Sequence, residues 1–199
     1  MQGELRFRIA LGIVFAALLV VRVYYQIQAR RAGAVTEFEG KANIAARIVA
    51  GLGSFALLVL YLVNPAALAW ASVALPSWLR WAGLPIGVLG IVLLLWVHLE
   101  LGANFRGTLH LREGHTLITS GPYRWVRHPM YTAFFAITLS FTLLSVNWLI
   151  GTIFTGVLVF VMITRVKREE EVMRERFGVE YQTWELRTGR FLPRLRAQD

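Results

Sequence analysis

The chain has 199 residues, 56% of them hydrophobic, and its mean hydropathy is +0.54. These values exclude an ordinary soluble domain and leave too little length for several domains. The net charge of +9 comes from basic clusters that alternate with charge-free runs, a pattern that favours anionic lipid headgroups over nucleic acid as the partner of the basic segments. The chain has no cysteine, which excludes disulfides, thiolate metal sites and cysteine nucleophiles.

Three apolar segments in the first half are long enough to cross a bilayer as helices, at residues 9–25, 48–63 and 81–97. Arg22 lies near the end of the first segment, where we expect its side chain to extend to the membrane interface. Gly83 and Gly87 are four residues apart in the third, a spacing that lets two helices pack closely. The stretch 66–75 is too short to span the bilayer and is predicted to be re-entrant or interfacial.

The second half contains one apolar run, residues 130–165, which as a single helix would be roughly 54 Å long. That length exceeds one membrane span, so the sequence predicts a hairpin of two helices that turns at Ser145, Val146 and Asn147. The fold class is therefore predicted to be all-α, a polytopic membrane bundle of about five transmembrane helices with a cytosolic loop and a C-terminal amphipathic helix.

The amphipathic helix is predicted from an apolar stripe beyond the last span, formed by Met173, Phe177, Tyr181 and Trp184 at helical spacing. The aromatic side chains of this stripe favour contact with the membrane or with the cytosolic loops. Gly178 is expected to break the helix.

Eighteen of the 21 Lys and Arg residues lie in three segments, at residues 22–47, 106–127 and from 165 onward. With five spans, all three segments fall on the same side of the membrane. The excess of positive charge predicts that this side is cytoplasmic, with the N-terminus outside and the C-terminus and active site inside.

The polar loop before the fourth span ends at Pro129, a residue that favours the first turn of a helix. His128 then lies near the cap position, and the free N–H groups of the helix end are suited to a carboxylate or phosphate. The alternative is structural: Gly121 and Pro122 form a turn, Arg124 and Arg127 contact headgroups, and the histidine only caps a helix.

Where the fifth span leaves the membrane, Arg165 is followed by Glu169 and Glu170. Residues 165 and 169 share one helix face, and a surface ion pair explains them adequately. Carboxylates at this depth are also candidates for binding a cationic ligand. The four histidines lack a metal-ligand spacing, and neither a dinucleotide nor a Walker A motif occurs, so we predict no metal site and no Rossmann nucleotide site.

Taken together, HTLITSGPYRWVRHPMY, two apolar helices, RVKREEEVMRERFGVEYQTW and RFLP resemble the isoprenylcysteine carboxyl methyltransferase family and the related phospholipid methyltransferases. The resemblance covers about residues 98–194, and its specificity comes from both halves occurring in order. It implies a membrane bundle whose last helices and cytosolic loops enclose S-adenosylmethionine while a lipid substrate enters from the bilayer. Residues 1–199 are then one membrane methyltransferase domain, with the cofactor-binding and catalytic region at 98–194.

The resemblance also implies roles for individual residues. Arg165 matches the arginine that faces the substrate, Glu170 the second member of an acidic pair, and Arg190 part of the closing basic segment, and these three are the catalytic candidates. Ala133 departs from the family, which usually has glycine there. The implied cofactor contacts are His115, Thr116, Leu117, Ile118, Tyr123, His128, Pro129, Met130, Tyr131 and Glu169.

The sequence hypothesis is therefore methyl transfer from S-adenosylmethionine to a membrane-embedded lipid or lipidated substrate, with a prenylcysteine carboxylate, a phospholipid and a free isoprenoid acid as candidates. No nucleic-acid partner is expected. One alternative is a non-enzymatic membrane scaffold or small transporter, which explains the spans without the motifs. Another is an enzyme similar to membrane sterol reductases, which would bind a nicotinamide cofactor.

Overall fold

The computed structural model describes residues 2–31, 41–102 and 117–194, and within these ranges the chain is helical and forms no β-strand. The predicted all-α class is therefore confirmed. The five α-helices and two 3-10 helices run in the order α1 (Gln2–Arg31), α2 (Lys41–Val63), η1 (Pro65–Ala71), α3 (Ser77–Leu101), η3 (Gly121–Arg124), α4 (Pro129–Ser145) and α5 (Trp148–Arg187).

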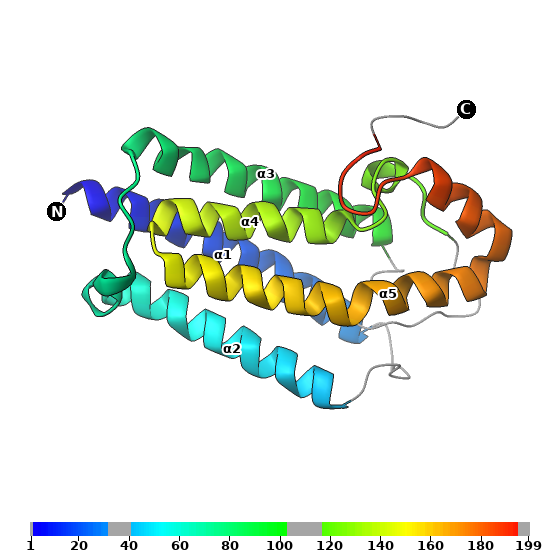
Figure 1. Ribbon diagram of the computed structural model, residues 1–199, viewed down its shortest axis with the longest axis horizontal. Coiled ribbons are helices and arrows are strands. Elements are labelled where there is room, and N and C mark those ends of the chain that lie inside the picture. Colours follow the sequence, from blue (N-terminus) through cyan, green and yellow to red (C-terminus); the bar gives the residue numbers. More distant parts are fainter. Residues whose placement is uncertain (1, 32–40, 103–116, 195–199) are drawn as a thin grey trace.

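The five long helices form a bundle in which successive helices run in opposite directions (Figure 1). Helix α4 contacts α1, α3 and α5, and α2 packs against α5. The ends of α1, α3 and α5 and the starts of α2 and α4 gather at one end of the bundle, which is opposite the N-terminus. The described parts of the predicted basic segments adjoin this end of the bundle.

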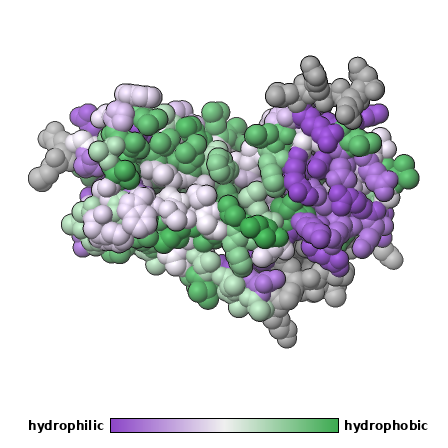
Figure 2. Space-filling model, in the orientation of Figure 1, coloured by the Kyte–Doolittle hydropathy of each residue, from purple (hydrophilic) through white to green (hydrophobic). Residues whose placement is uncertain are grey.

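In the part of the chain that the structure describes, four helices are long and apolar enough to span a bilayer, namely α1, α2, α3 and α5, whereas α4 is apolar but has only 17 residues. The bundle therefore matches a multi-pass membrane protein, with α4 at the lower limit for a span. Side chains of hydrophobic and intermediate hydropathy cover most of the visible bundle surface, and strongly hydrophilic ones gather where α5 ends (Figure 2). Helices suit this setting because they satisfy their backbone hydrogen bonds internally.

The predicted hairpin turn lies between α4 and α5. Val146 adopts a left-handed backbone conformation with φ 45° and ends α4. Asn147 caps α5 by accepting a hydrogen bond from the Ile150 N–H at 3.2 Å, and its amide donates to the Leu68 carbonyl at 2.9 Å. The fully buried asparagine thus joins the hairpin to η1, the short non-spanning helix within the stretch predicted to be re-entrant or interfacial.

Glycines allow α3 to approach α4 closely, as their spacing predicted. A Cβ at Gly83 would lie 3.0 Å from the Leu143 Cβ, and one at Gly87 would lie 3.0 Å from the Ser140 Cβ. Gly90 lies against the backbone of Ala133, which is itself fully buried. The methyl group of Ala133 is therefore accommodated in the helix contact.

Helix α5 continues beyond its apolar part and turns back over the end of the bundle (Figure 1). Gly178 has φ 51° and ψ −123°, a non-helical conformation that a residue with a Cβ rarely adopts, so the predicted break is confirmed. The part after the break carries Trp184, whose indole N–H donates to the Tyr123 carbonyl at 3.0 Å. The stripe predicted from the sequence therefore contacts the polar loop through Trp184.

Replacing Gly87 by leucine should lower the free energy of unfolding by about 2 kcal/mol, because the new side chain overlaps Ser140 and Val14. The matched control is Gly156→Leu, because a Cβ at that position would have no neighbouring side chain within 4 Å. Thermal unfolding of both variants in detergent measures the difference. Equal stability of the two variants would contradict the close α3–α4 contact.

Candidate functional site

The polar loop before α4 and the C-terminal segment are held together by their backbones. The N–H of Arg127 donates to the Gly189 carbonyl at 2.8 Å, and the N–H of His128 donates to the Arg190 carbonyl at 3.0 Å. His128 is the N-cap residue of α4, as predicted, although its side chain makes no capping hydrogen bond. The ring of His128 is thereby directed at α5, where the two glutamates lie.

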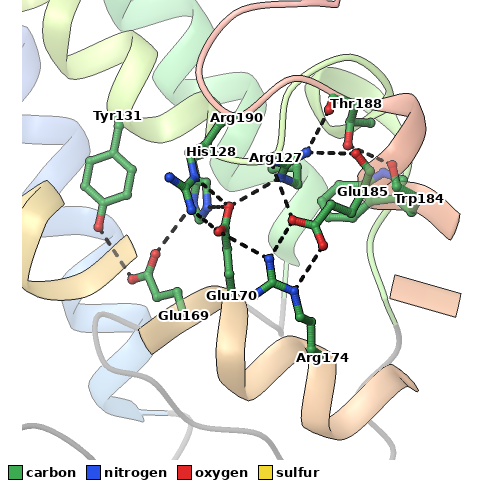
Figure 3. Close-up of polar contacts among 10 residues, drawn as sticks. All are labelled: Arg127, His128, Tyr131, Glu169, Glu170, Arg174, Trp184, Glu185, Thr188 and Arg190. Carbon is green, nitrogen blue, oxygen red and sulfur yellow. Dashed lines mark hydrogen bonds and ion pairs between the residues drawn. The ribbon is translucent and has the colours of Figure 1, made fainter. Parts of the chain in front are cut away.

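Glu170 is the centre of a buried ion cluster (Figure 3). Its side chain is 1% exposed, and both of its oxygens bind the guanidinium of Arg190, with the Nε at 2.9 Å from Oε1. The Nε2 of His128 lies 3.2 Å and the Nε of Arg127 3.4 Å from Oε1. Arg174 approaches Oε2 at 3.8 Å. One carboxylate therefore joins α5, the loop and the C-terminal segment.

The charge of Glu170 is fixed by this cluster. Burial alone raises the pKa of a carboxyl, but the hydrogen bonds and charges of Arg190 and His128 outweigh burial and hold the pKa of Glu170 well below 4.5. In turn, the hydrogen bond with Glu170 raises the pKa of Arg190. A carboxylate bound this firmly is a weak base, so its geometry favours positioning over proton transfer.

A second group of contacts supports the cluster from outside. Arg127 donates to the backbone carbonyls of Glu185 at 2.9 Å and Thr188 at 2.7 Å. Arg174 binds the Glu185 carboxylate through two hydrogen bonds, of 3.0 and 2.7 Å. These bonds hold the end of α5 against the loop after the break at Gly178.

Glu169, the neighbour of Glu170, is turned toward Tyr131 (Figure 3). Its Oε1 lies 3.1 Å from the guanidinium of Arg165 and accepts a long hydrogen bond of 3.5 Å from the Tyr131 hydroxyl. Its Oε2 lies 3.6 Å from the Nδ1 of His128. The imidazole therefore bridges two carboxylates, one within the buried cluster and one at the wall of a cavity.

This cavity has a volume of about 850 Å³ and continues from the loop into the bundle. Its polar end is lined by Tyr123, His128, Tyr131, Glu169 and Arg165, and its apolar part by side chains of α1, α2, α4 and α5. Burial, together with the nearby Glu169 charge, raises the pKa of Tyr123, whose phenol therefore stays neutral. The volume and the few convergent polar groups are typical of a small-molecule site.

The predicted site residues fall into three groups. Pro129, Glu170 and Arg190 do not line the cavity but form its supporting structure. His115 and Thr116 lie outside the described residues. The residues that line the cavity are Leu117, Ile118, Tyr123, His128, Met130, Tyr131, Arg165 and Glu169.

Some residues of the site were not predicted from the sequence. Met173, Tyr181 and Trp184 belong to the apolar stripe predicted beyond the last span. These three side chains line the cavity, so the stripe faces inward. Arg22 and Arg47 line it from α1 and α2. Arg22 was expected at the membrane interface, yet its guanidinium lies over the Phe134 ring, 5.5 Å from the centroid. An ionisable residue inside an apolar span was the available signal.

Comparison with known proteins agrees with this arrangement. The sequence model of the isoprenylcysteine carboxyl methyltransferase (ICMT) family matches residues 83–175. The predicted family resemblance is confirmed. The match includes α4, Arg165 and both glutamates, whereas α1, α2 and Arg190 lie outside it.

Among curated relatives, a protein-S-isoprenylcysteine O-methyltransferase of Rattus norvegicus is 29% identical over 126 residues, covering 62% of this chain and 44% of the relative. The Saccharomyces cerevisiae protein of the same name is 35% identical over 79 residues, 40% of this chain and 33% of the relative. This chain thus spans less than half the length of either relative it matches.

The fold has a counterpart among solved structures. The structure of the eukaryotic intramembrane Ras methyltransferase ICMT superposes with a TM-score of 0.60 and covers 92% of this chain and 67% of its own. The two sequences are 22% identical, so the likeness concerns the fold. The first two helices are therefore part of a shared architecture although the family match begins only in α3.

Replacing Glu170 by glutamine should lower the free energy of unfolding by about 3 kcal/mol, because Arg127 loses the charge that balances it in a buried site. Hydrogen exchange of residues 186–194 should also become faster. Glu171→Gln is the control, since that carboxylate pairs with the exposed side chains of Lys167 and Arg168. Equal protection in both variants would contradict the central role of Glu170.

The cluster should also set a pH dependence. Because the pKa of Glu170 is lower in the folded chain than its ordinary 4.5, its contribution is fully present above that value and is lost as the pH falls toward the folded pKa. The difference in melting temperature between the wild type and Glu170→Gln should therefore persist from about pH 8 to pH 5 and shrink below about pH 4. A difference that already falls between pH 7 and pH 5 would contradict this account.

Proposed function

We propose that the chain is an S-adenosylmethionine-dependent methyltransferase that esterifies the carboxylate of a membrane-embedded, isoprenylcysteine-like substrate. The observation that carries the proposal is the continuous cavity, which joins the polar groups around Glu169 to an apolar interior between the helices. A site with these two parts suits a polar cofactor and a lipid chain at once. The names of the matched relatives point to the same chemistry.

The residues at the polar end fit the cofactor. Glu169 would accept hydrogen bonds from its ammonium or ribose hydroxyl groups and balance its positive charge. Tyr123, Tyr131 and Trp184 supply aromatic surface for the adenine and the sulfonium region. S-adenosylmethionine supplies a methyl group on a positively charged sulfur, which transfers by in-line displacement. We include His115 and Thr116 among the proposed contacts on the family resemblance alone.

In the proposed reaction the chain aligns the two reactants and excludes water, which are the main needs of a displacement at carbon. Arg165, positioned by Glu169, would hold the substrate carboxylate through its planar guanidinium. A carboxylate nucleophile needs no general base. An amine would need one, and of the two candidates, Glu170 and His128, the glutamate is unsuited because its carboxylate is held by cations and its pKa is lowered. Carboxylates are therefore favoured over aminophospholipids.

We assign Glu170 and Arg190 positioning roles. Their ion pair fixes the C-terminal segment, and the backbone of that segment holds His128 at the cavity wall. We also propose that the end of the bundle that carries this site faces the cytoplasm, because the basic segments adjoin it. Residues 1–199 would then act as one domain, with the chemistry in 98–194.

Isothermal titration with S-adenosylhomocysteine, the stable product, tests the proposal on the detergent-purified chain. Binding should be weakened about tenfold in Glu169→Gln, which removes a charged acceptor, and further in combination with Tyr131→Ala. Glu171→Gln should bind as the wild type does. No binding by folded wild type, or preferential binding of a nicotinamide cofactor, would overturn the proposed function.

A further inference from the structure

Arg22 is a cation inside the bundle, close to the proposed reaction site. It projects from α1, lines the cavity, and lies over Phe134, one turn beyond Tyr131 on α4. Arg165 lines the same cavity and pairs with Glu169, which accepts a hydrogen bond from Tyr131. Arg22 therefore approaches the same part of the cavity as Arg165, but from a helix outside the region that matches the ICMT family.

Ion pairing does not explain why Arg22 lies at this position. Within residues 2–31, 41–102 and 117–194, no carboxylate forms an ion pair with its guanidinium, which lies over the aromatic face of Phe134. Two guanidinium groups that face one cavity repel each other, and a partly buried charge without a counterion is costly. An ionisable residue in an apolar span is a candidate for ligand binding.

The charges around the cavity indicate what that ligand is. Four arginines line it, Arg22, Arg47, Arg127 and Arg165, whereas Glu169 is the one acid among its described lining residues. Glu169 pairs with Arg165, and Arg127 is paired with acids behind the wall. S-adenosylmethionine has two cationic groups and one carboxylate and so adds positive charge. An anionic second ligand would balance the charge of Arg22.

We propose that Arg22, together with Arg165, forms the binding site for the carboxylate of the substrate and restricts the substrates of this chain to apolar molecules with an anionic end. The inference rests on the proposed function and deepens it. The two guanidinium groups, from α1 and α5, would hold a carboxylate between them. Their repulsion is then relieved by the substrate, and the reacting oxygen is held near Tyr131 and Glu169.

The apolar walls next to Arg22 fit the rest of such a substrate. On α1, Phe15, Leu18 and Leu19 line the cavity on the turns that precede Arg22, and Leu52 and Phe55 of α2 line it as well. A prenyl chain that extends from a carboxylate at Arg22 would lie along these side chains. The shared chemistry is an apolar chain with a carboxylate, which either a prenylated cysteine or a free isoprenoid acid supplies.

The test measures methyl transfer to N-acetyl-S-farnesylcysteine and to farnesoic acid by the full chain in nanodiscs. In Arg22→Gln, the KM for the accepted acid should rise about tenfold or more, as expected for the loss of a charged hydrogen bond. Arg22→Lys should recover part of the loss. Arg6→Gln is the matched control, because Arg6 is exposed on the same helix and does not line the cavity. The acid with the lower KM identifies the source of the carboxylate.

A second measurement compares the acid with its amide. The carboxamide of farnesylcysteine should inhibit the wild type at least tenfold more weakly than farnesylcysteine itself does, and this preference should become smaller in Arg22→Gln, which retains Arg165. Equal affinity of the wild type for acid and amide, or an unchanged KM in Arg22→Gln, would overturn the role of Arg22.

Titration with S-adenosylhomocysteine separates the two proposals. Arg22→Gln should bind it as tightly as the wild type, which shows that the cofactor site is intact and that the KM change concerns the lipid substrate. If the wild type binds S-adenosylhomocysteine and methylates the acid, and Arg22→Gln is equally active, only the inference about Arg22 is overturned. A folded wild type that neither binds nor methylates overturns the proposed function itself.

Discussion

The site depends on one buried carboxylate. Glu170 receives Arg190 from the C-terminal segment and His128 and Arg127 from the loop before α4, so three parts of the chain that are distant in sequence meet at one helix position. Because neighbouring residues of a helix point in directions about 100° apart, the same turn presents Glu169 to the cavity. A buried charge is stable only when it is fully paired, and this requirement fixes the loop and the segment together.

The sequence predicted those features that arise within one helix or at one turn. The hairpin at Ser145 to Asn147 followed from a run too long for one span, and the close α3–α4 contact followed from glycines four residues apart. The pairing of Arg165 with Glu169 followed from helical spacing. Contacts between distant segments were not predictable in this way. Nothing local indicates that Arg190 binds Glu170, or that Arg22 faces a cavity instead of the membrane interface, because both depend on how the helices pack.

The first two helices and the rest of the chain differ in how far they resemble other proteins. The family match covers residues 83–175, which contain the polar end of the cavity, whereas α1 and α2 supply much of its apolar wall. In the proposed function, the matched part would bind the cofactor and perform the chemistry, while the first two helices would select the lipid. Selection by Arg22 would then be a property of this chain that the matched region does not determine. The substrate would be recognised by its charge at one end and its apolar chain along the rest.

The central claim is that a prenyl substrate and the cofactor occupy this one cavity together. Photo-crosslinking tests it most directly, with a farnesylcysteine that carries a diazirine on its prenyl chain, applied in the presence of saturating S-adenosylhomocysteine and followed by peptide mass spectrometry. The account predicts labelling of cavity-facing residues such as Leu18 and Phe55, which excess unlabelled farnesylcysteine prevents and S-adenosylhomocysteine does not. Labelling confined to outward-facing residues such as Leu89 and Val92, or loss of the cavity label when S-adenosylhomocysteine binds, would contradict it.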